Sequence, residues 1–399
     1  MQPSASQDAL PHRAASVVSL VAALIEEGHR EHASDVHLDP TPLGIRVRIR
    51  IDGILFERHI LPSSIHSELI ARIKILAGLR TDEHNASQDG RFRHAFGEPP
   101  ASVDVRVSIM PTYHGENVVL RLLYGAVEEY SLLELGFGEE ERLKIESVLT
   151  QSNGMILATG PTGSGKTTTL YTLLRKLSVP RVSIVTIEDP IEYAIEGIRQ
   201  IQVNTRTGLL FATGLRSLLR QDPDIIMVGE IRDEDTARVA VNTALTGHLL
   251  LSTLHTTDAP TAIPRLLDIG IEPYLLASTL SLIIGQRLVR KICTECRTEI
   301  TLPKDVASRL AAFTKENPVW FTGTGCTLCK ESGYRGRVSI NEVMVVTDAL
   351  REAIMRGGSA HEFKTLAKKA GMKTMIEDGL EKAQRGETSV EEVLRAIHE

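Results

Sequence analysis

Residues 155–170 read MILATGPTGSGKTTTL, and this stretch decides the fold of the 399-residue chain. A short apolar run is followed by Gly-x-x-x-x-Gly-Lys-Thr, from Gly160 to Thr167, and then by a run that suits a helix. Glycines in this spacing let backbone N–H groups curl around phosphates, and the next helix turns its positive N-terminal end towards them. The stretch therefore predicts a strand, a phosphate-binding loop and a helix of an α/β domain.

The loop also predicts how a nucleotide would be held. Lys166 is expected to reach the β- and γ-phosphates and the Thr167 hydroxyl to ligate Mg²⁺, so ATP and Mg²⁺ are the expected cofactors. A glycine-rich turn that matches by chance is the alternative, which the flanking strand and helix disfavour. The predicted nucleotide-binding residues of the loop are Gly160, Pro161, Thr162, Gly163, Ser164, Gly165, Lys166, Thr167 and Thr168.

Short apolar runs alternate with helix-compatible segments beyond residue 154, which is typical of a parallel sheet with helices on its faces. The predicted strands are 155–159, 182–187, 225–228 and 249–252. Glu188 and Asp189 follow the second strand, and Glu230 follows the third. Because ligands of open α/β sheets bind beyond the carboxyl ends of the strands, we expect these acids to converge on the phosphate loop.

Carboxylates at that edge can orient or deprotonate an attacking water, or bind magnesium through its waters. Asp189 is assigned to nucleotide binding, although a simple turn before Pro190 is the alternative. His255 follows the last predicted strand and could sense the γ-phosphate, whereas His248 enters at the opposite edge. A lone histidine is more often structural, so both readings stay open for these two residues.

The first 120 residues or so predict a separate mixed α/β domain. Residues 45–51 alternate apolar and arginine side chains, and Asp52-Gly53 is a hairpin turn before a return strand over 54–60. A helix is expected over 62–79, and a second hairpin has strands at 103–109 and 117–123 around the turn PTYHGE. An amphipathic helix near residues 17–25 has no cleavage site after it, and no apolar run is long enough to span a membrane, which favours a cytoplasmic chain.

All four cysteines fall in two Cys-x-x-Cys pairs, Cys293/Cys296 and Cys326/Cys329. Four thiolates suit a tetrahedral structural zinc that leaves no open coordination position for catalysis. Reversible disulfides or unmetallated thiols are the alternatives. Lys and Arg number 45 against 51 Asp and Glu, and this net charge of −6 argues weakly against a duplex-DNA binder.

The sequence motifs described above, taken together, resemble those of the type II secretion and type IV pilus ATPases. The matching segments are GPTGSGKTTTL, TIEDPIE, DIIMVGEIRD, TGHLLLSTLHT, ASDVHLDP, RIRIDG, QDGRF, DVRVSIMPTYHGENVVLRLL and the cysteine pairs, over roughly residues 30–340. The resemblance implies a RecA-like phosphate-loop core, a smaller PAS-like N-terminal domain and a tetracysteine zinc subdomain. The expected parts are an N-terminal domain 1–123, a hinge 124–138, and an ATPase domain 139–399 that includes the zinc subdomain 289–337 and a helical region 340–399.

The resemblance also implies residue roles. Glu188 matches the glutamate assigned to water activation, and Glu230 matches the acid near magnesium. Arg106 and Arg121 match arginines that the N-terminal domain projects into a nucleotide site, although solvated strand arginines are the alternative without the resemblance. It further favours functional roles for His248 and His255.

A motor of this family is a hexameric ring that hydrolyses ATP to ADP and phosphate to power type II secretion or type IV pilus assembly. The implied partner is an inner-membrane platform protein, with peripheral attachment to the cytoplasmic face of the inner membrane and no nucleic-acid partner. A DNA-uptake or translocation motor, or a pilus-retraction ATPase, is the alternative. Family members usually carry a further N-terminal domain, so this chain is expected to be truncated or naturally short.

Overall fold

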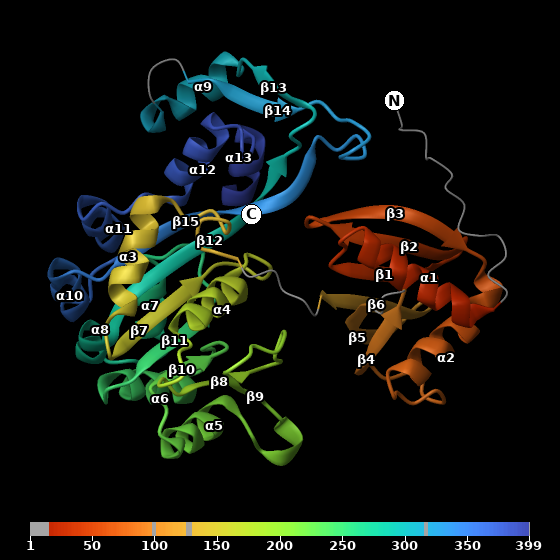
Figure 1. Cartoon of the computed structure of the whole chain (residues 1–399), viewed down its shortest axis with the longest axis horizontal. Helices are drawn as coiled ribbons and strands as arrows, with labels where there is room; N and C mark the ends of the chain where they lie inside the picture. The colour runs from red at the N-terminus through yellow and green to blue at the C-terminus, as the bar shows by residue number, and fades with distance from the viewer. Residues whose placement is uncertain (1–15, 98–100, 125–129, 315–317, 399) are drawn as a thin grey trace. The chain divides into compact units, whose positions relative to one another are not determined.

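The computed structural model divides the chain into two compact units, residues 1–127 and residues 128–399 (Figure 1). The described residues are 16–97, 101–124, 130–314 and 318–398. Residues 125–129 of the predicted hinge therefore lie outside the described residues. Each unit is built around its own sheet.

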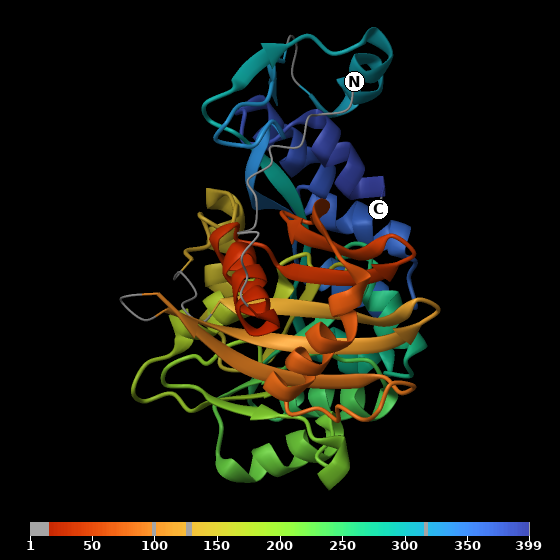
Figure 2. The same cartoon turned by 90° about the vertical axis from the view of Figure 1, so that its right-hand side faces the viewer.

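The N-terminal unit is a six-stranded antiparallel sheet in the order β3-β2-β1-β6-β5-β4, with two helices packed on one face. Figure 2 shows these helices, in red and orange, on the near side of the sheet. The elements are α1 (Val17–Arg30), β1 (Asp35–Thr41), β2 (Gly44–Ile51), β3 (Ile54–Leu61), the 3₁₀ turn Ser63–Ile65, α2 (His66–Leu76), β4 (Gln88–Phe96), β5 (Ala101–Thr112) and β6 (Gly115–Tyr124).

Both predicted hairpins form, with one correction. Ile45, Val47 and Ile49 of β2 are buried under the helices, and the turn at Asp52-Gly53 has positive φ at both residues, as a tight hairpin requires. The expected turn PTYHGE is wrong in length, because β5 and β6 keep pairing through this stretch up to Thr112 and Gly115. The mixed α/β prediction is confirmed, and the PAS-like comparison stays a prediction.

The C-terminal unit contains a seven-stranded sheet in the order β15-β12-β7-β11-β10-β8-β9. All neighbours are parallel except β15, which runs antiparallel to β12. Its strands are β7 (Gly154–Thr159), β8 (Ile184–Glu188), β9 (Arg199–Gln202), β10 (Ile225–Val228), β11 (Leu249–Leu254), β12 (Leu280–Ile292) and β15 (Tyr334–Val345). The predicted parallel sheet is confirmed.

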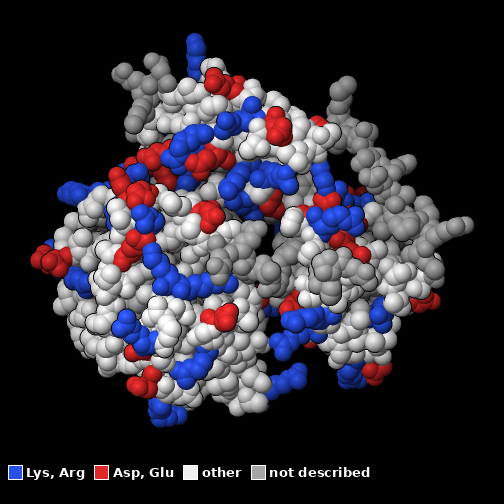
Figure 3. All heavy atoms as spheres, in the orientation of Figure 1, with Lys and Arg blue, Asp and Glu red and all other residues white. Residues whose placement is uncertain are grey.

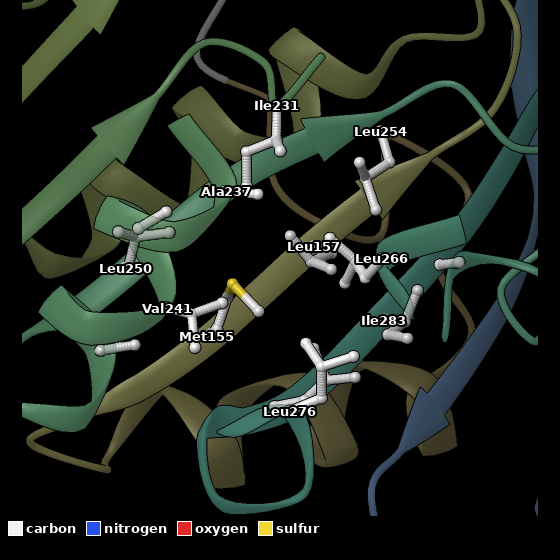
Figure 4. Close-up of a cluster of buried hydrophobic side chains, with 14 of the residues drawn as sticks. Met155, Leu157, Ile231, Ala237, Val241, Leu250, Leu254, Leu266, Leu276 and Ile283 are labelled. Carbon is white, nitrogen blue, oxygen red and sulfur yellow. The ribbon is translucent and has the colours of Figure 1, made fainter. Parts of the chain in front are cut away.

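Helices cover both faces of this sheet. They are α3 (Glu139–Leu149), α4 (Lys166–Leu177), α5 (Phe211–Leu218), α6 (Glu234–Leu245), α7 (Ala262–Asp268), α8 (Pro273–Thr279), α10 (Asp348–Met355) and α11 (Ala360–Lys369). Helices α3 and α4 pack on one face, and the others on the opposite face. Met155 and Leu157 of β7 face one core and Ile156 and Ala158 the other, so this stretch of the strand is apolar on both faces; Figure 4 shows Met155 and Leu157.

Strands β12 and β15 extend beyond the sheet and carry the cysteine-containing element at their far ends. This element holds β13 (Arg297–Ile300), α9 (Lys304–Leu310) and β14 (Trp320–Gly323), and it packs against α12 (Met375–Gln384) and α13 (Val390–His398). The expected subdomain limits at 289 and 337 fall inside these two strands, neither of which was predicted. The helical region expected from residue 340 starts later, at Asp348, because residues up to Val345 belong to β15.

Candidate nucleotide site

The phosphate loop lies between β7 and α4 and is pressed against β12. Gly160 and Gly165 have φ of 144° and 89°. A Cβ at Gly160 would lie 2.3 Å from the Gln286 carbonyl oxygen, and one at Gly165 would lie 2.8 Å from the Gln286 side-chain nitrogen. Only glycine fits at these two positions, because both the backbone conformation and the space exclude a side chain. Gly160 and Gly165 are therefore required for the conformation of the loop and for its close contact with β12.

Lys166 is positioned for an anionic ligand. Its side chain is buried, and Nζ donates hydrogen bonds of 2.8 Å to the carbonyl oxygens of both Gly160 and Pro161. Burial lowers the pKa of Lys166 to about 8, and the Glu230 carboxylate opposes this shift. Within the described residues, the buried Ser164 hydroxyl has no hydrogen-bond partner. A buried ammonium and a spare hydroxyl at a helix N-terminus suit bound phosphates.

The other loop residues line the same turn. Pro161, Thr162 and Gly163 are exposed at its tip, whereas Thr167 and Thr168 are half-buried in the first turn of α4. The backbone N–H groups at the start of that helix have no intrahelical acceptor, so they are available to a phosphate. The predicted set is thus contiguous in space as well as in sequence.

Glu230 reaches the same edge of the sheet. β7, β11 and β10 run parallel, so their carboxyl ends lie together. The Glu230 carboxylate is 2.6 Å from Arg232 Nε and 3.3 Å from His255 Nε2. Of the three acids expected to converge on the phosphate loop, Glu230 lies close enough to Lys166 to act on its pKa, and His255 lies beside Glu230. Arg232 is an additional charged partner that was not predicted.

Glu188 ends β8 at this edge, but it faces inward. It is 2% exposed, and its carboxylate accepts hydrogen bonds from the Tyr171 hydroxyl, from Thr186 Oγ1 at 2.5 Å and from Gln200 Nε2 at 3.1 Å. Burial and the Glu188 charge raise the pKa of Tyr171 well above its usual range. Three donors hold this buried carboxylate in place, which favours a positioning role. Asp189, the next residue, is exposed.

The two histidines are separated by the length of β11. His255 lies just beyond its carboxyl end, whereas His248 precedes its first residue and contacts the carbonyl oxygen of Thr243 at 3.2 Å. Six residues of strand span about 20 Å. Within one chain, only His255 is brought to the phosphate loop, so a catalytic role for His248 stays a prediction.

Arg106 and Arg121 are directly opposite each other on β5 and β6, and Arg91 of β4 is opposite Arg106. They lie on the sheet face away from the helices, because their neighbours in sequence are buried in the core. Arg121 Nε is 3.0 Å from the buried carboxylate of Asp35. The strands thus form a row of guanidinium groups with one acid that orients Arg121. Their approach to a nucleotide stays a prediction.

The four cysteines gather at the ends of β12 and β15 with their Sγ atoms within 4.8 Å of one another. Cys293–Cys326, Cys296–Cys329 and Cys326–Cys329 are separated by 3.8, 3.8 and 3.7 Å between Sγ atoms. A tetrahedron with Zn–S bonds of about 2.3 Å has S–S edges of about 3.8 Å, so this cluster could bind zinc. Although burial opposes ionisation, N–H groups of Cys326 and Gly333 help to lower the pKa of the Cys329 thiol to about 7.

Comparison with known proteins identifies the family. A family described as "Type II/IV secretion system protein" matches residues 11–395. Type II secretion system protein E of Xanthomonas campestris pv. campestris is 46% identical over 387 residues, which cover 96% of this chain and 68% of that protein. The type IV pilus assembly ATPase PilB of Thermus thermophilus is 44% identical over 94% of this chain and 42% of its own length.

Among solved structures, the pilus retraction motor PilT with bound ADP is 26% identical, with a TM-score of 0.64 over 94% of this chain and 96% of that chain. The α/β ATPase fold expected from the phosphate loop is therefore confirmed. In the part of the chain that the structure describes, no helix combines the length and apolar content that a membrane crossing needs. With a family match along nearly its whole length and the fold to accompany it, the chain belongs to the type II/IV secretion system protein family.

Proposed function

We propose that this chain hydrolyses ATP to ADP and phosphate and that it powers type II secretion or type IV pilus assembly. The observation that carries the proposal is the meeting of Lys166, Glu230 and His255 at the carboxyl edge of one parallel sheet. A type II secretion system ATPase and a type IV pilus assembly ATPase among the relatives support the biological role. The identities of 46% and 44% to the two relatives named above exceed the 26% of the retraction motor, which favours assembly over retraction.

The proposed chemistry divides the work among the residues at this edge. The loop N–H groups and Lys166 hold the phosphates, and Glu230 orients or deprotonates the attacking water. His255 and Arg232 fix the Glu230 carboxylate, because both contact the same oxygen. Thr167, with Glu230 acting through water, would hold Mg²⁺, which neutralises charge on the phosphates when bound.

Glu188 was expected to activate water, and that assignment stays a prediction. Its bonds to Tyr171, Thr186 and Gln200 support a different proposal, in which it ties α4 to β8 and β9 and so fixes the helix that begins with Lys166. Asp189 is proposed to contact the nucleotide side of the loop from its exposed position.

Charge that develops on the transferred phosphoryl group needs a cation, and we assign this role to Arg106 and Arg121 from a neighbouring copy. A head-to-tail contact of this kind closes into a ring, which supports the hexamer proposal. The partner proposed for the ring is an inner-membrane platform protein, with the chain held peripherally at the cytoplasmic face. The cysteine cluster is proposed to bind one structural zinc.

A DNA-translocating motor is the second candidate, and the surface charge disfavours it. In the view of Figure 3, basic and acidic side chains intermingle over the C-terminal unit and form no single-sign track. A DNA motor would need such a basic path along its substrate. DNA-stimulated ATP turnover would favour this candidate over the secretion motor.

Phosphate release from Mg·ATP, measured against protein concentration, tests the proposal. Turnover per chain should rise steeply with concentration, and Lys166→Ala, Glu230→Gln and Arg106→Ala should each abolish most of it. Glu352→Gln, on the exposed side of α10, is the matched control. Flat specific activity with an unimpaired Arg106→Ala variant would contradict the ring with shared sites, and absent turnover would contradict the ATPase itself.

A further inference from the structure

Glu342 on β15 is a buried carboxyl group to which the proposed chemistry gives no role. It is 2% exposed, and the strand register places Thr159, Gly285 and Glu342 in one row across β7, β12 and β15. Thr159 directly precedes the phosphate loop. The Glu342 carboxyl group therefore lies on the same row of paired residues as the end of β7, where the phosphate loop begins.

Both carboxyl oxygens of Glu342 contact backbone N–H groups. Oε1 accepts a hydrogen bond of 2.6 Å from Ala259, and Oε2 accepts one of 3.4 Å from Met375, the first residue of α12. A Cβ at Gly285 would lie 2.8 Å from Glu342 Cγ and 3.0 Å from Ala259 N. The glycine thus leaves the space through which the carboxyl group reaches Ala259.

Burying the Glu342 carboxyl group costs desolvation free energy. Burial raises the pKa of Glu342 to about 7, although the Ala259 N–H works in the opposite direction. An apolar residue would fill the same volume without that desolvation cost. A carboxyl group retained here, and bonded to a loop backbone, is expected to serve the position of that loop.

The loop in question carries His255. It leaves β11 at Leu254 and is fixed again at Ala259, so only four residues lie between two anchored points. Inside it, Thr256 Oγ1 donates a hydrogen bond to the carbonyl oxygen of Asp258. The Asp258 carboxylate accepts one of 2.9 Å from the N–H of Thr261, which lies just beyond the loop. A short, internally bonded loop transmits a shift at one end to the other, and His255 Nε2 is 3.3 Å from Glu230.

We propose that Glu342 is a positioning residue that holds the 255–259 loop and thereby sets His255 against Glu230. The inference rests on the proposed function, in which His255 and Glu230 act on the nucleotide. The competing explanation is that Glu342 only stabilises the N-terminus of α12, as an acid at a helix start does. That explanation predicts lower stability without a specific effect on His255.

Glu342→Gln tests the inference with little change in volume. A carboxylate accepts at both oxygens, whereas a carboxamide accepts at one, so either Ala259 or Met375 then faces an N–H₂ donor. We expect kcat to fall about tenfold while the KM for ATP stays within about twofold, the pattern of a lost transition-state interaction. Glu352→Gln is again the control.

A double-variant cycle separates the two explanations. If Glu342 acts through His255, the variant with both His255→Ala and Glu342→Gln should be no slower than His255→Ala alone. Multiplied losses, or an unchanged kcat in Glu342→Gln, would overturn the inference. Gly285→Ala pushes the same carboxyl group away from Ala259 and should reproduce the kinetic pattern if the glutamine variant does not fold.

A readout independent of turnover keeps the inference separate from the proposed function. Nuclear magnetic resonance of protein labelled with ¹³C-histidine reports on the 13 histidine rings of the chain. The His255 ring resonance is assigned as the one that is missing from the spectrum of the His255→Ala variant. It should shift in Glu342→Gln and stay in place in Glu352→Gln. A static His255 resonance would overturn the positioning role, whereas an inactive wild-type protein with a shifting resonance would overturn only the ATPase proposal.

Discussion

Replacing Tyr171 by Phe removes one buried oxygen from the group that surrounds Glu188, and we expect both stability and turnover to fall. The ring itself should stay in place, because it projects from α4 into the core, is fully buried there, and packs edge-on against Tyr193 with centroids 4.6 Å apart. What disappears is the hydrogen bond from its hydroxyl to the Glu188 carboxylate.

The size of the loss follows from that bond. Hydrogen bonds to charged acceptors contribute about 1.5–3 kcal/mol, and Glu188 keeps the donors of Thr186 and Gln200, so the free energy of unfolding should fall by about 2 kcal/mol. For a unit of this size the melting temperature should fall by about 4–8 °C. Turnover should fall by less than about tenfold, because Lys166 remains on a helix that has lost one of several anchors.

Urea unfolding followed by far-ultraviolet circular dichroism measures the first quantity, and phosphate release measures the second. Tyr274→Phe is the matched control, since Tyr274 is 55% exposed on α8 and its change should stay within about 0.5 kcal/mol. Equal unfolding free energies for Tyr171→Phe and Tyr274→Phe would refute the claim that Glu188 serves as an anchor for α4.

Three further predictions concern the two glutamates, the cysteine cluster and Lys166. Glu230→Gln should reduce kcat at least about a hundredfold and Glu188→Gln less than about tenfold; the reverse order would return water activation to Glu188. Removing zinc with a chelator should release about one zinc per chain and lower the melting temperature, whereas Cys326→Ser should bind little zinc and show no further change; a wild-type protein without zinc would contradict the site. Burial lowers the pKa of Lys166 from 10.5 to about 8. Between pH 8 and 10.5 the unfolded chain therefore binds more protons than the folded chain, so the nucleotide-free protein should become more stable as the pH rises, whereas its affinity for ATP should fall. The Lys166→Met variant should lack this gain in stability.

Local sequence patterns predicted the elements whose pattern is continuous. The alternation of Ile45, Val47 and Ile49 with arginines marks a strand with one buried face, and the apolar run 225–228 marks one buried on both. Strands β12 and β15 were missed because each changes character along its length, from buried apolar residues within the sheet to charged ones near the cysteines. Pairing between them fixes their conformation, and no local periodicity records it.

In the nucleotide site, too, some features could be predicted from the sequence and others could not. Lys166, Glu230 and His255 could be predicted because a parallel sheet brings strand ends to one edge whatever the intervening sequence. The bonds that hold them could not. Tyr171 and Gln200 meet Glu188 from α4 and β9, and Glu342 meets Ala259 across 83 residues of chain. Such contacts depend on side-chain directions that the sequence alone leaves open.

Gly229 occupies the position after β10 where many phosphate-loop ATPases carry an aspartate, and its surroundings give a physical reason. A Cβ there would lie 3.2 Å from Glu188 Cα and 3.4 Å from the Ile187 carbonyl oxygen, so the ends of β8 and β10 already touch. An aspartate would have to push the two strand ends apart and would add a second negative charge beside the buried Glu188 carboxylate.

Delaying the acid by one residue avoids both costs. The Glu230 carboxylate instead contacts Arg232, which compensates its charge, and His255, and it lies close enough to Lys166 to oppose the lowering of the Lys166 pKa by burial. Gly229→Ala isolates the steric part of this argument. We expect it to lower stability by about 1–3 kcal/mol as the strand ends separate, and to lower kcat through Glu230. A fully stable and active Gly229→Ala variant would show that the strand ends have room to spare, and the glycine would then need a different explanation.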